Sequence, residues 1–349
     1  MHADTIAERP SATRAPADAR AAFLPGLAYP LVLEPARQAL RDDPAAAAGW
    51  FAQHQAEVDA LAERHGAVLL RGFAVRDTAD FGRWANAFPG GPLDYEMGAS
   101  PRQELRGRVF ESTRFPMAYR IGLHNELSYM RDYPRRIVFF CRQSSSTGGE
   151  TILGDMEQVH AALPASVRDA FETRGLRYLR NFRFKTPGER PSRLDEVMHR
   201  GWNEIFGTDD RAEAQARCDA LGLAWTWLAD GGLRTEYHAP AVRLHPRRGR
   251  PVWFNQATTF HPNARSLGSI YPLVARRYPD PESVPYTVTF GDGEPIPFAV
   301  LEPVYDALDR LTVAFPWRNG DVLILDNLRI AHGRNPYTGA RDVQVFMAR

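Results

Sequence analysis

Three residues have the types and spacing needed to hold one metal ion. His124 and Glu126 are two positions apart, and residues i and i+2 of an extended segment point to the same side. His332 lies far along the chain, after the apolar run at residues 322–325. Two histidines and one carboxylate leave three positions open on one face of Fe(II). A bidentate 2-oxo acid can take two of these positions and O2 the third.

A second set of residues could bind the distal carboxylate of a 2-oxo diacid. Arg341 lies nine residues after His332. The planar fork of an arginine makes two charge-assisted hydrogen bonds to a carboxylate. The hydroxyl of Thr151 could add a third bond, and Arg334 and Arg349 are the other arginines near His332.

The same residues leave two other classes of protein open. A zinc hydrolase could use His124, Glu126 and His332 with a bound water, and it would not need Thr151 or Arg341. A non-catalytic scaffold of a biosynthetic assembly would not bind metal tightly at these positions. Substitution of Arg341 would leave the hydrolase active, so that residue distinguishes the classes.

Several segments together resemble one enzyme family. They are GLHNELSYM, GGETILGDM, RYLRNF, VWFNQATTFHPNA, GDGEPI and GDVLILDN-(x)4-HGRNPYTGAR. In order and spacing they resemble the taurine dioxygenase (TauD/TfdA) family of Fe(II)- and 2-oxoglutarate-dependent oxygenases, from about residue 65 to the end. The resemblance is strongest to a subgroup typified by the syringomycin-pathway aspartyl β-hydroxylase. That subgroup is associated with natural-product assembly and acts on amino-acid units, in some cases tethered to a carrier protein.

The resemblance implies a role for each candidate residue. His124, Glu126 and His332 match the iron ligands, and Thr151 and Arg341 match the residues that bind the cosubstrate carboxylate. The implied cofactors are Fe(II), 2-oxoglutarate and O2, with succinate and CO2 as coproducts.

Two positions depart from the pattern of many family members. The carboxylate ligand is Glu126 rather than Asp, as in the matching subgroup, and Val345 stands where some members have a second arginine. The contacts of the cosubstrate's proximal carboxylate are therefore left open. Related radical halogenases lack the carboxylate and bind chloride in its place, so Glu126 favours hydroxylation over halogenation. Desaturation and cyclisation remain alternatives.

The surrounding elements are predicted to be rich in strands. Short apolar runs at 67–73, 137–141, 322–325 and 343–347 predict buried strands, whereas residues 33–66 and 156–174 are predicted to be largely helical. Strands and helices do not alternate strictly, which argues against a doubly wound parallel sheet. The expected fold is a β-rich α+β protein. Its core is the double-stranded β-helix (jelly roll, cupin-like) that the resemblance implies, with flanking and inserted helices.

The chain is expected to form one oxygenase domain. Residues 1–22, rich in Ala and Arg, are predicted to be a mobile tail, and residues 23–349 the domain, with an insert around 175–300. The 43 basic and 42 acidic residues give a net charge of +1, without the basic excess of a nucleic-acid binder. No apolar run approaches the length of a membrane helix. Two cysteines exclude a disulfide scaffold and favour a cytoplasmic location.

The substrate is expected to be a small amino-acid-type molecule, either free or presented by a peptidyl carrier protein. The basic stretch at residues 247–250 is a candidate docking site for such a carrier. The sequence carries no signal for the oligomeric state. Polar residues in probable pocket segments are candidate substrate contacts: Arg180, Asn181, Asn255 and His261.

Overall fold

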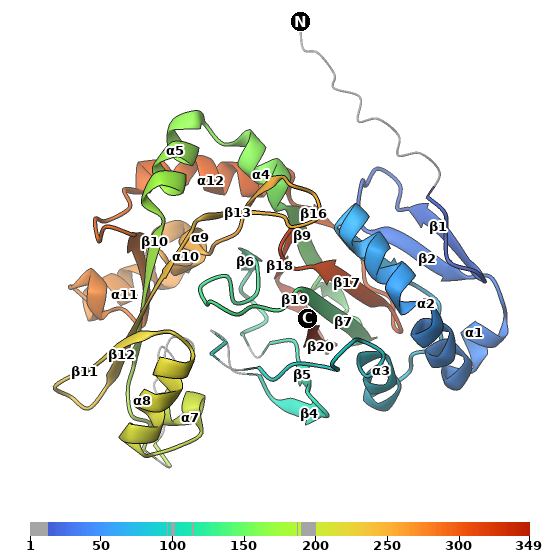
Figure 1. The fold of residues 1–349 in the computed structure, drawn as a ribbon, viewed down its shortest axis with the longest axis horizontal. Coiled ribbons are helices and arrows are strands. Elements are labelled where there is room, and N and C mark those ends of the chain that lie inside the picture. Colours follow the sequence, from blue (N-terminus) through green and yellow to red (C-terminus); the bar gives the residue numbers. More distant parts are fainter. Residues whose placement is uncertain (1–12, 96, 99–101, 114, 187, 190–199) are drawn as a thin grey trace, which may run out of the picture.

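Two facing sheets form the centre of the protein (Figure 1). The computed structural model describes residues 13–95, 97–98, 102–113, 115–186, 188–189 and 200–349. The larger sheet has eight strands in the order β1-β2-β3-β17-β7-β20-β5-β4, and the smaller has four in the order β16-β9-β18-β6. This two-sheet sandwich is the predicted jelly-roll core.

The larger sheet is antiparallel except between β2 and β3, which run parallel. Its strands come from the N-terminal and the C-terminal parts of the chain, so the sheet is complete only when both parts are in place. They are β1 (Ala19–Phe23), β2 (Leu31–Pro35), β3 (Ala67–Leu70), β4 (Glu104–Arg106), β5 (Val109–Glu111), β7 (Arg136–Gln143), β17 (Val322–Asp326) and β20 (Asp342–Ala348).

The smaller sheet carries the candidate metal ligands. Its strands are β6 (Ile121–His124), β9 (Thr151–Asp155), β16 (Val313–Ala314) and β18 (Ile330–Arg334). The core between the sheets follows the two-residue period of a strand, because Ile137 and Phe139 of β7 share one cluster with Leu153 and Ile330 of the smaller sheet. The metal site is therefore built on a packed scaffold.

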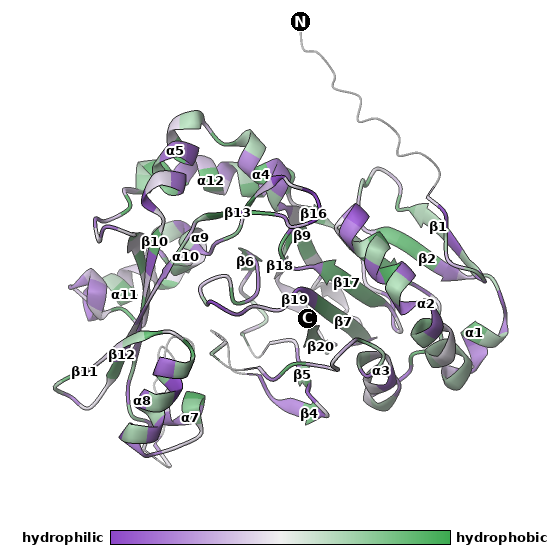
Figure 2. Cartoon of the chain, in the orientation of Figure 1, coloured by the Kyte–Doolittle hydropathy of each residue, from purple (hydrophilic) through white to green (hydrophobic). Residues whose placement is uncertain are grey.

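Helices cover the other face of the larger sheet. They are α1 (Ala39–Asp42), α2 (Pro44–His65) and α3 (Thr78–Ala85). Val138 and Phe140 alternate with the inward residues of β7 and pack with Phe51 of α2 and Phe81 of α3. Because both faces of β7 and β17 are covered, these strands are almost continuously hydrophobic (Figure 2).

Two of the predicted helices differ in extent from the observed elements. The segment from residue 33 was expected to be helical, but Leu31–Pro35 is a buried strand that pairs with β3. The segment 156–174 is two helices, α4 (Met156–Ala162) and α5 (Ala165–Arg174), because Pro164 lies between them.

Residues 176–290 supply a third sheet beside the sandwich, in the order β11-β12-β10-β15. Its strands are β10 (Leu176–Phe182), β11 (Ala224–Trp227), β12 (Leu233–Ala239) and β15 (Tyr286–Phe290). The remaining elements are β8 (Thr147–Gly148), β13 (Val242–Leu244), β14 (Pro251–Trp253), β19 (Tyr337–Thr338), α7 (Trp202–Phe206), α8 (Arg211–Ala220), α9 (Ala257–Phe260), α10 (Ala264–Leu267), η1 (Gly268–Ile270), α11 (Tyr271–Arg277), η2 (Pro281–Ser283) and α12 (Phe298–Leu311).

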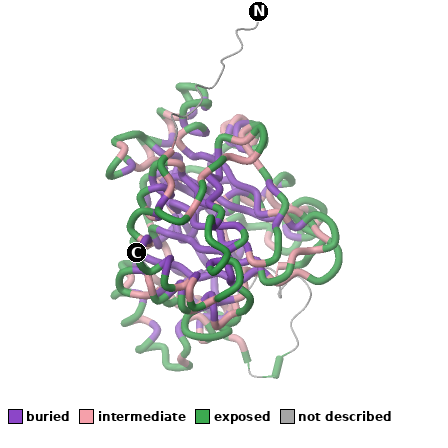
Figure 3. Tube along the Cα trace, turned by 90° about the vertical axis from the view of Figure 1, so that its right-hand side faces the viewer, coloured by how far each residue is buried: buried purple, intermediate pink, exposed green. Residues whose placement is uncertain are grey.

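The predicted N-terminal tail lies partly inside the fold. Residues 1–12 are outside the described residues, but Ala19–Phe23 forms strand β1 and pairs with β2. Residues 19–22 of the predicted tail are therefore part of the larger sheet, and the alternating exposure along Ala19–Phe23 is that of a half-buried edge strand. Buried segments run through the middle of the molecule and exposed loops surround them (Figure 3). Among the described residues, no helix has the length and apolar character needed to span a membrane.

Candidate active site

His124 and His332 face each other across two paired strands. His124 ends β6 and His332 lies at the partner position of β18, so their ring centroids are 4.5 Å apart. The Nδ1 of His124 lies 2.9 Å from the carbonyl oxygen of Gly122. A proton on Nδ1 donated to this carbonyl leaves Nε2 free to bind a metal.

Glu126 is held by a buried asparagine on the turn between β17 and β18. The Glu126 amide donates to Oδ1 of Asn327 at 2.8 Å, and Nδ2 of Asn327 donates to the Glu126 carbonyl at 3.0 Å. The side chain of Asn125 donates to the Asn327 backbone carbonyl at 2.6 Å. These bonds fix the backbone of the carboxylate ligand, and sequence reasoning gave Asn327 no role.

The three predicted ligands meet at one point. One potential ligand atom from each of His124, Glu126 and His332 lies within 4.8 Å of the other two. Nε2 of His332 is 4.0 Å from Oε2 of Glu126. Burial, with the nearby His124 and Arg102, lowers the pKa of His332 well below its ordinary value, which keeps the ring neutral for metal binding. Two imidazoles and one carboxylate are a donor set that fits Fe(II).

A small cavity opens beside this cluster. Thr151 is buried there, opposite Arg334 in the strand pairing, and its Oγ1 accepts a hydrogen bond from Nε1 of Trp317 at 3.1 Å. The cavity therefore contains the predicted cosubstrate residues together with two ligands. Its lining is Arg102, Ser112, Thr113, Ile121, His124, Phe139, Thr151, His332, Gly333, Arg334 and Arg341.

Arg341 is the arginine suited to bind an anion among the three that follow His332 in the sequence. Its Nε donates to the Gly149 carbonyl at 3.0 Å, and its terminal nitrogens have no hydrogen-bond partner among the described residues. Burial lowers the pKa of Arg341 to about 10, and the nearby Arg334 contributes. Arg334 instead donates to the backbone carbonyls of Phe115, Pro116 and Tyr119. Arg349 does not line this cavity.

Arg102 is a cavity residue that sequence reasoning missed. Its side chain is 5% exposed, and Nη2 lies 2.5 Å from Oε2 of Glu126. Its guanidinium carbon also lies 4.3 Å from the ring centroid of Tyr95. No sequence motif surrounds Arg102, and only the fold brings it to Glu126.

The side chains of Arg180 and Asn181 donate hydrogen bonds to backbone carbonyls. Arg180 donates to the carbonyl of Met97 at 2.7 Å, and its guanidinium lies against the rings of Tyr129, Phe182 and Tyr286. The amide of Asn181 donates to the carbonyls of Glu282 and Val284. Neither residue lines the metal cavity.

Asn255 and His261 likewise make internal contacts. Asn255 donates to the Ala241 carbonyl at 2.8 Å and lies outside the metal cavity. His261 uses both ring nitrogens, on the Ile296 carbonyl and on the amide of Asn263, and is also outside it. Their neighbour Gln256 connects this segment to the site, because its side chain donates to the carbonyl of Asn125 at 2.8 Å.

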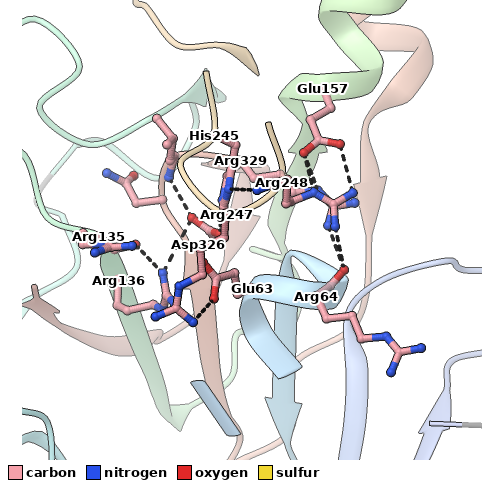
Figure 4. Close-up of polar contacts among 12 residues, drawn as sticks. Glu63, Arg64, Arg135, Arg136, Glu157, His245, Arg247, Arg248, Asp326 and Arg329 are labelled. Carbon is pink, nitrogen blue, oxygen red and sulfur yellow. Dashed lines mark hydrogen bonds and ion pairs between the residues drawn. The ribbon is translucent and has the colours of Figure 1, made fainter. Parts of the chain in front are cut away.

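The basic stretch 247–250 belongs to a network of ion pairs that includes Asp326 and Arg329 at the turn after β17 (Figure 4). Arg247 pairs with Glu63 at 2.7 Å and Arg248 with Glu157 at 2.5 Å. These two arginines are therefore partly neutralised within the chain, which weakens the case for a carrier docking site. We call this set the turn network: Asp59, Glu63, Arg136, Asp155, Glu157, His245, Arg247, Arg248, Asp326 and Arg329.

Comparison with known proteins adds independent evidence. The model of the taurine catabolism dioxygenase TauD, TfdA family matches residues 33–347. Dapdiamide synthesis protein DdaC of Enterobacter agglomerans is 31% identical over 298 residues, which are 85% of this chain and 86% of that protein. A clavaminate synthase-like protein of Arabidopsis thaliana is 33% identical over 291 residues, which are 82% of each chain.

Solved structures share the fold at low sequence identity. PvcB from Pseudomonas aeruginosa has a TM-score of 0.54 at 18% identity, over 98% of this chain and 95% of that chain. A second PvcB structure, described as an Fe, alpha-ketoglutarate dependent oxygenase from an isonitrile synthetic pathway, has a TM-score of 0.52 at 18% identity with the same coverage. These similarities confirm the predicted jelly-roll fold.

The family match confirms the predicted enzyme class and cofactors, which are Fe(II), 2-oxoglutarate and O2. It begins about thirty residues before the resemblance found by inspection, and so includes β2 and the helices that cover the larger sheet. An oxygenase, rather than a zinc hydrolase or a non-catalytic scaffold, accounts for the presence of three candidate metal ligands beside Thr151 and Arg341. The chain belongs to the TauD/TfdA family of Fe(II)- and 2-oxoglutarate-dependent oxygenases.

Proposed function

We propose that this oxygenase hydroxylates an unactivated C–H bond of an amino-acid-type substrate in secondary-metabolite biosynthesis. One observation carries the chemistry: His124, Glu126 and His332 converge at a cavity that also contains Thr151 and Arg341. One relative is a dapdiamide synthesis protein and one structural neighbour is an oxygenase of an isonitrile synthetic pathway, which supports a biosynthetic role.

Each residue of the site has a defined task in this proposal. His124, Glu126 and His332 hold the iron, while Arg341 and Thr151 bind the distal carboxylate of 2-oxoglutarate. When bound, Fe(II) with 2-oxoglutarate and O2 supplies the oxidising power to break an unactivated C–H bond, with release of succinate and CO2. The chain itself orients both molecules and limits access of water.

Glu126 favours hydroxylation over halogenation. Its carboxylate contributes an oxygen ligand at the position that a halide would need, and Asn327 holds its backbone in place. Desaturation and cyclisation would use the same residues. Mass spectrometry of the product separates hydroxylation, which adds one oxygen atom to the substrate, from desaturation and cyclisation, which both remove two hydrogen atoms.

An anaerobic absorption titration tests the cofactor site directly. Addition of Fe(II) and then 2-oxoglutarate to the metal-free protein should produce a metal-to-ligand charge-transfer band. The band should be absent in His124→Ala and present in His238→Ala, a matched control in which an exposed histidine paired with Glu236 is removed. A folded protein that gives no band would contradict the proposal.

The same titration separates the oxygenase from a zinc hydrolase. Arg341→Ala should weaken 2-oxoglutarate binding about tenfold or more, because a charge-assisted bidentate contact is lost. Arg217→Ala, which removes an exposed arginine of α8, should leave binding unchanged. Unaltered 2-oxoglutarate binding in Arg341→Ala would remove this residue from the cosubstrate site.

A further inference from the structure

The cavity beside the candidate metal ligands has more positive charge than Glu126 and bound Fe(II) and 2-oxoglutarate would neutralise. Arg102, Arg334 and Arg341 line it, and over the described residues its lining contains no carboxylate. Glu126, the metal ligand beside it, is the nearby acid. Since Fe(II) and the 2-oxoglutarate dianion cancel each other's charge, three guanidinium groups against Glu126 leave an excess of positive charge. A buried excess of this kind is costly unless another anion enters the site.

Arg102 has free hydrogen-bond donors at this place. Its Nη2 bonds to Glu126, but Nε and Nη1 are buried and have no hydrogen-bond partner among the described residues. Buried donors are almost always paired in folded proteins. Nε and Nη1 lie on different edges of the planar guanidinium, so each can donate a separate charge-assisted hydrogen bond to an anionic ligand in the cavity.

Two other arginines bind backbone carbonyls a few residues before Arg102 in the chain: Arg180 donates to Met97 at 2.7 Å and Arg200 to Gly98 at 2.9 Å. The ring of Tyr95 lies against the Arg102 guanidinium. A binding group fixed by such contacts loses little entropy when a ligand arrives. These contacts also give Arg180 a positioning role instead of the direct substrate contact that the sequence suggested.

We propose that Arg102 binds a carboxylate of the organic substrate beside the iron. This inference rests on the proposed function and narrows its substrate class to amino-acid-type molecules that retain a free carboxylate. An aminoacyl thioester on a carrier protein has lost its α-carboxylate. Such a substrate would therefore meet Arg102 only if its side chain were acidic.

The charge-transfer band of the Fe(II)–2-oxoglutarate complex provides the test. Once the band has formed, each of a panel of L-amino acids is added, together with the corresponding α-carboxamide. At least one amino acid should perturb the band in the wild-type protein, and its amide should bind about tenfold more weakly or not at all. Arg102→Gln should abolish this preference while the 2-oxoglutarate affinity stays within about twofold, and Arg102→Lys should restore part of it because the charge returns without the fork.

The outcomes distinguish this inference from the proposed function. Absence of the band itself would overturn the proposed function. A normal band that no amino acid perturbs, or that acids and amides perturb equally, would overturn the role of Arg102 alone. Loss of 2-oxoglutarate affinity in Arg102→Gln would assign the residue to the cosubstrate instead. Arg217→Gln is the matched control and should behave as wild type, since this arginine is exposed on α8.

Discussion

Two groups of arginines lie on either side of the turn between β17 and β18, and they differ in what they pair with. In the turn network each arginine has a carboxylate partner, as in Arg329 with Asp155 and Arg248 with Glu157 (Figure 4). In the metal cavity Arg102 pairs with Glu126, which is itself a candidate metal ligand, and Arg334 and Arg341 form no ion pair with a carboxylate among the described residues. The turn network is matched in charge and holds the fold, whereas the cavity has an excess that its ligands must neutralise.

The partners of an arginine distinguish structural from functional arginines better than its burial does. Arg329 is 9% exposed and Arg334 3%, so both are buried. Arg329 satisfies a buried carboxylate next to α4, and Arg334 satisfies loop carbonyls. Arg334 leaves only its Nε unpaired, since both of its terminal nitrogens are bonded. Arg102 and Arg341 instead have terminal nitrogens without a hydrogen-bond partner among the described residues, beside the candidate metal ligands. Unpaired terminal nitrogens at this place, more than position in the sequence, identify the arginines that await a ligand.

The largest expected effect comes from the cavity. His332→Gln removes a metal ligand, so Fe(II)-dependent consumption of 2-oxoglutarate should fall by about 1,000-fold or more, or roughly 4 kcal/mol. The free energy of unfolding of the metal-free protein should change little, because the imidazole has an unpaired buried Nδ1 and no ion-pair partner closer than 4.0 Å. Succinate formation and urea denaturation measure the two quantities. Retained turnover would exclude His332 as a ligand.

In the turn network the same kind of substitution should affect stability instead. Arg329→Met leaves Asp155, which is 1% exposed, without its guanidinium partner. Breaking a buried pair costs about 3 kcal/mol. The urea midpoint should fall accordingly, while the charge-transfer band still forms in the folded protein. Arg250→Met is the matched control, because that side chain is exposed. A normal midpoint in Arg329→Met would show that the pair is not needed for stability.

The two regions also differ in how far the sequence predicts them. His124 and Glu126 are recognisable because they are close in the chain, and His332 because it follows a strongly apolar strand. Arg102 and Asn327 meet Glu126 only through the fold, and neither lies in a pattern that marks it. Their roles depend on side-chain partners from distant elements, which local spacing does not encode.

The missed fold details have a similar cause. Leu31–Pro35 lies shortly before the Ala-rich helix α2, but parallel pairing with β3 buries it as a strand. Local propensity is a weak guide where tertiary contacts decide. Asn255 and His261 were chosen as polar residues among aromatic ones. In the structure Asn255 donates to the Ala241 carbonyl, and His261 forms hydrogen bonds with the Ile296 carbonyl and the Asn263 side chain.

A smaller effect should follow from the bond between Arg102 and Glu126. In the metal-free protein Arg102 occupies the oxygen of Glu126 that lies closest to His332. The metal must compete with this ion pair, so Arg102→Met should increase the rise in Tm that Fe(II) or Zn(II) produces, by the equivalent of about 1 kcal/mol. Differential scanning fluorimetry under anaerobic conditions measures the rise. An unchanged or smaller rise would show that the ion pair does not oppose metal binding.

The smallest effect concerns pH and the arginines of the turn network. Half-buried His65 has its pKa lowered to about 4, first by burial and then by the positive charges of Arg64, Arg329 and Arg248. Between about pH 6.5 and 4 the unfolded chain therefore takes up a proton that the folded protein refuses, so stability is fully present above this window and falls as the pH is lowered through it. His65→Gln should reduce this fall by about 0.5 kcal/mol, a modest figure because solvent screens the charges. Urea midpoints of the two proteins at pH 7 and pH 4.5 measure the difference, and an equal fall in both proteins would show that the pKa of His65 is not lowered in the folded protein.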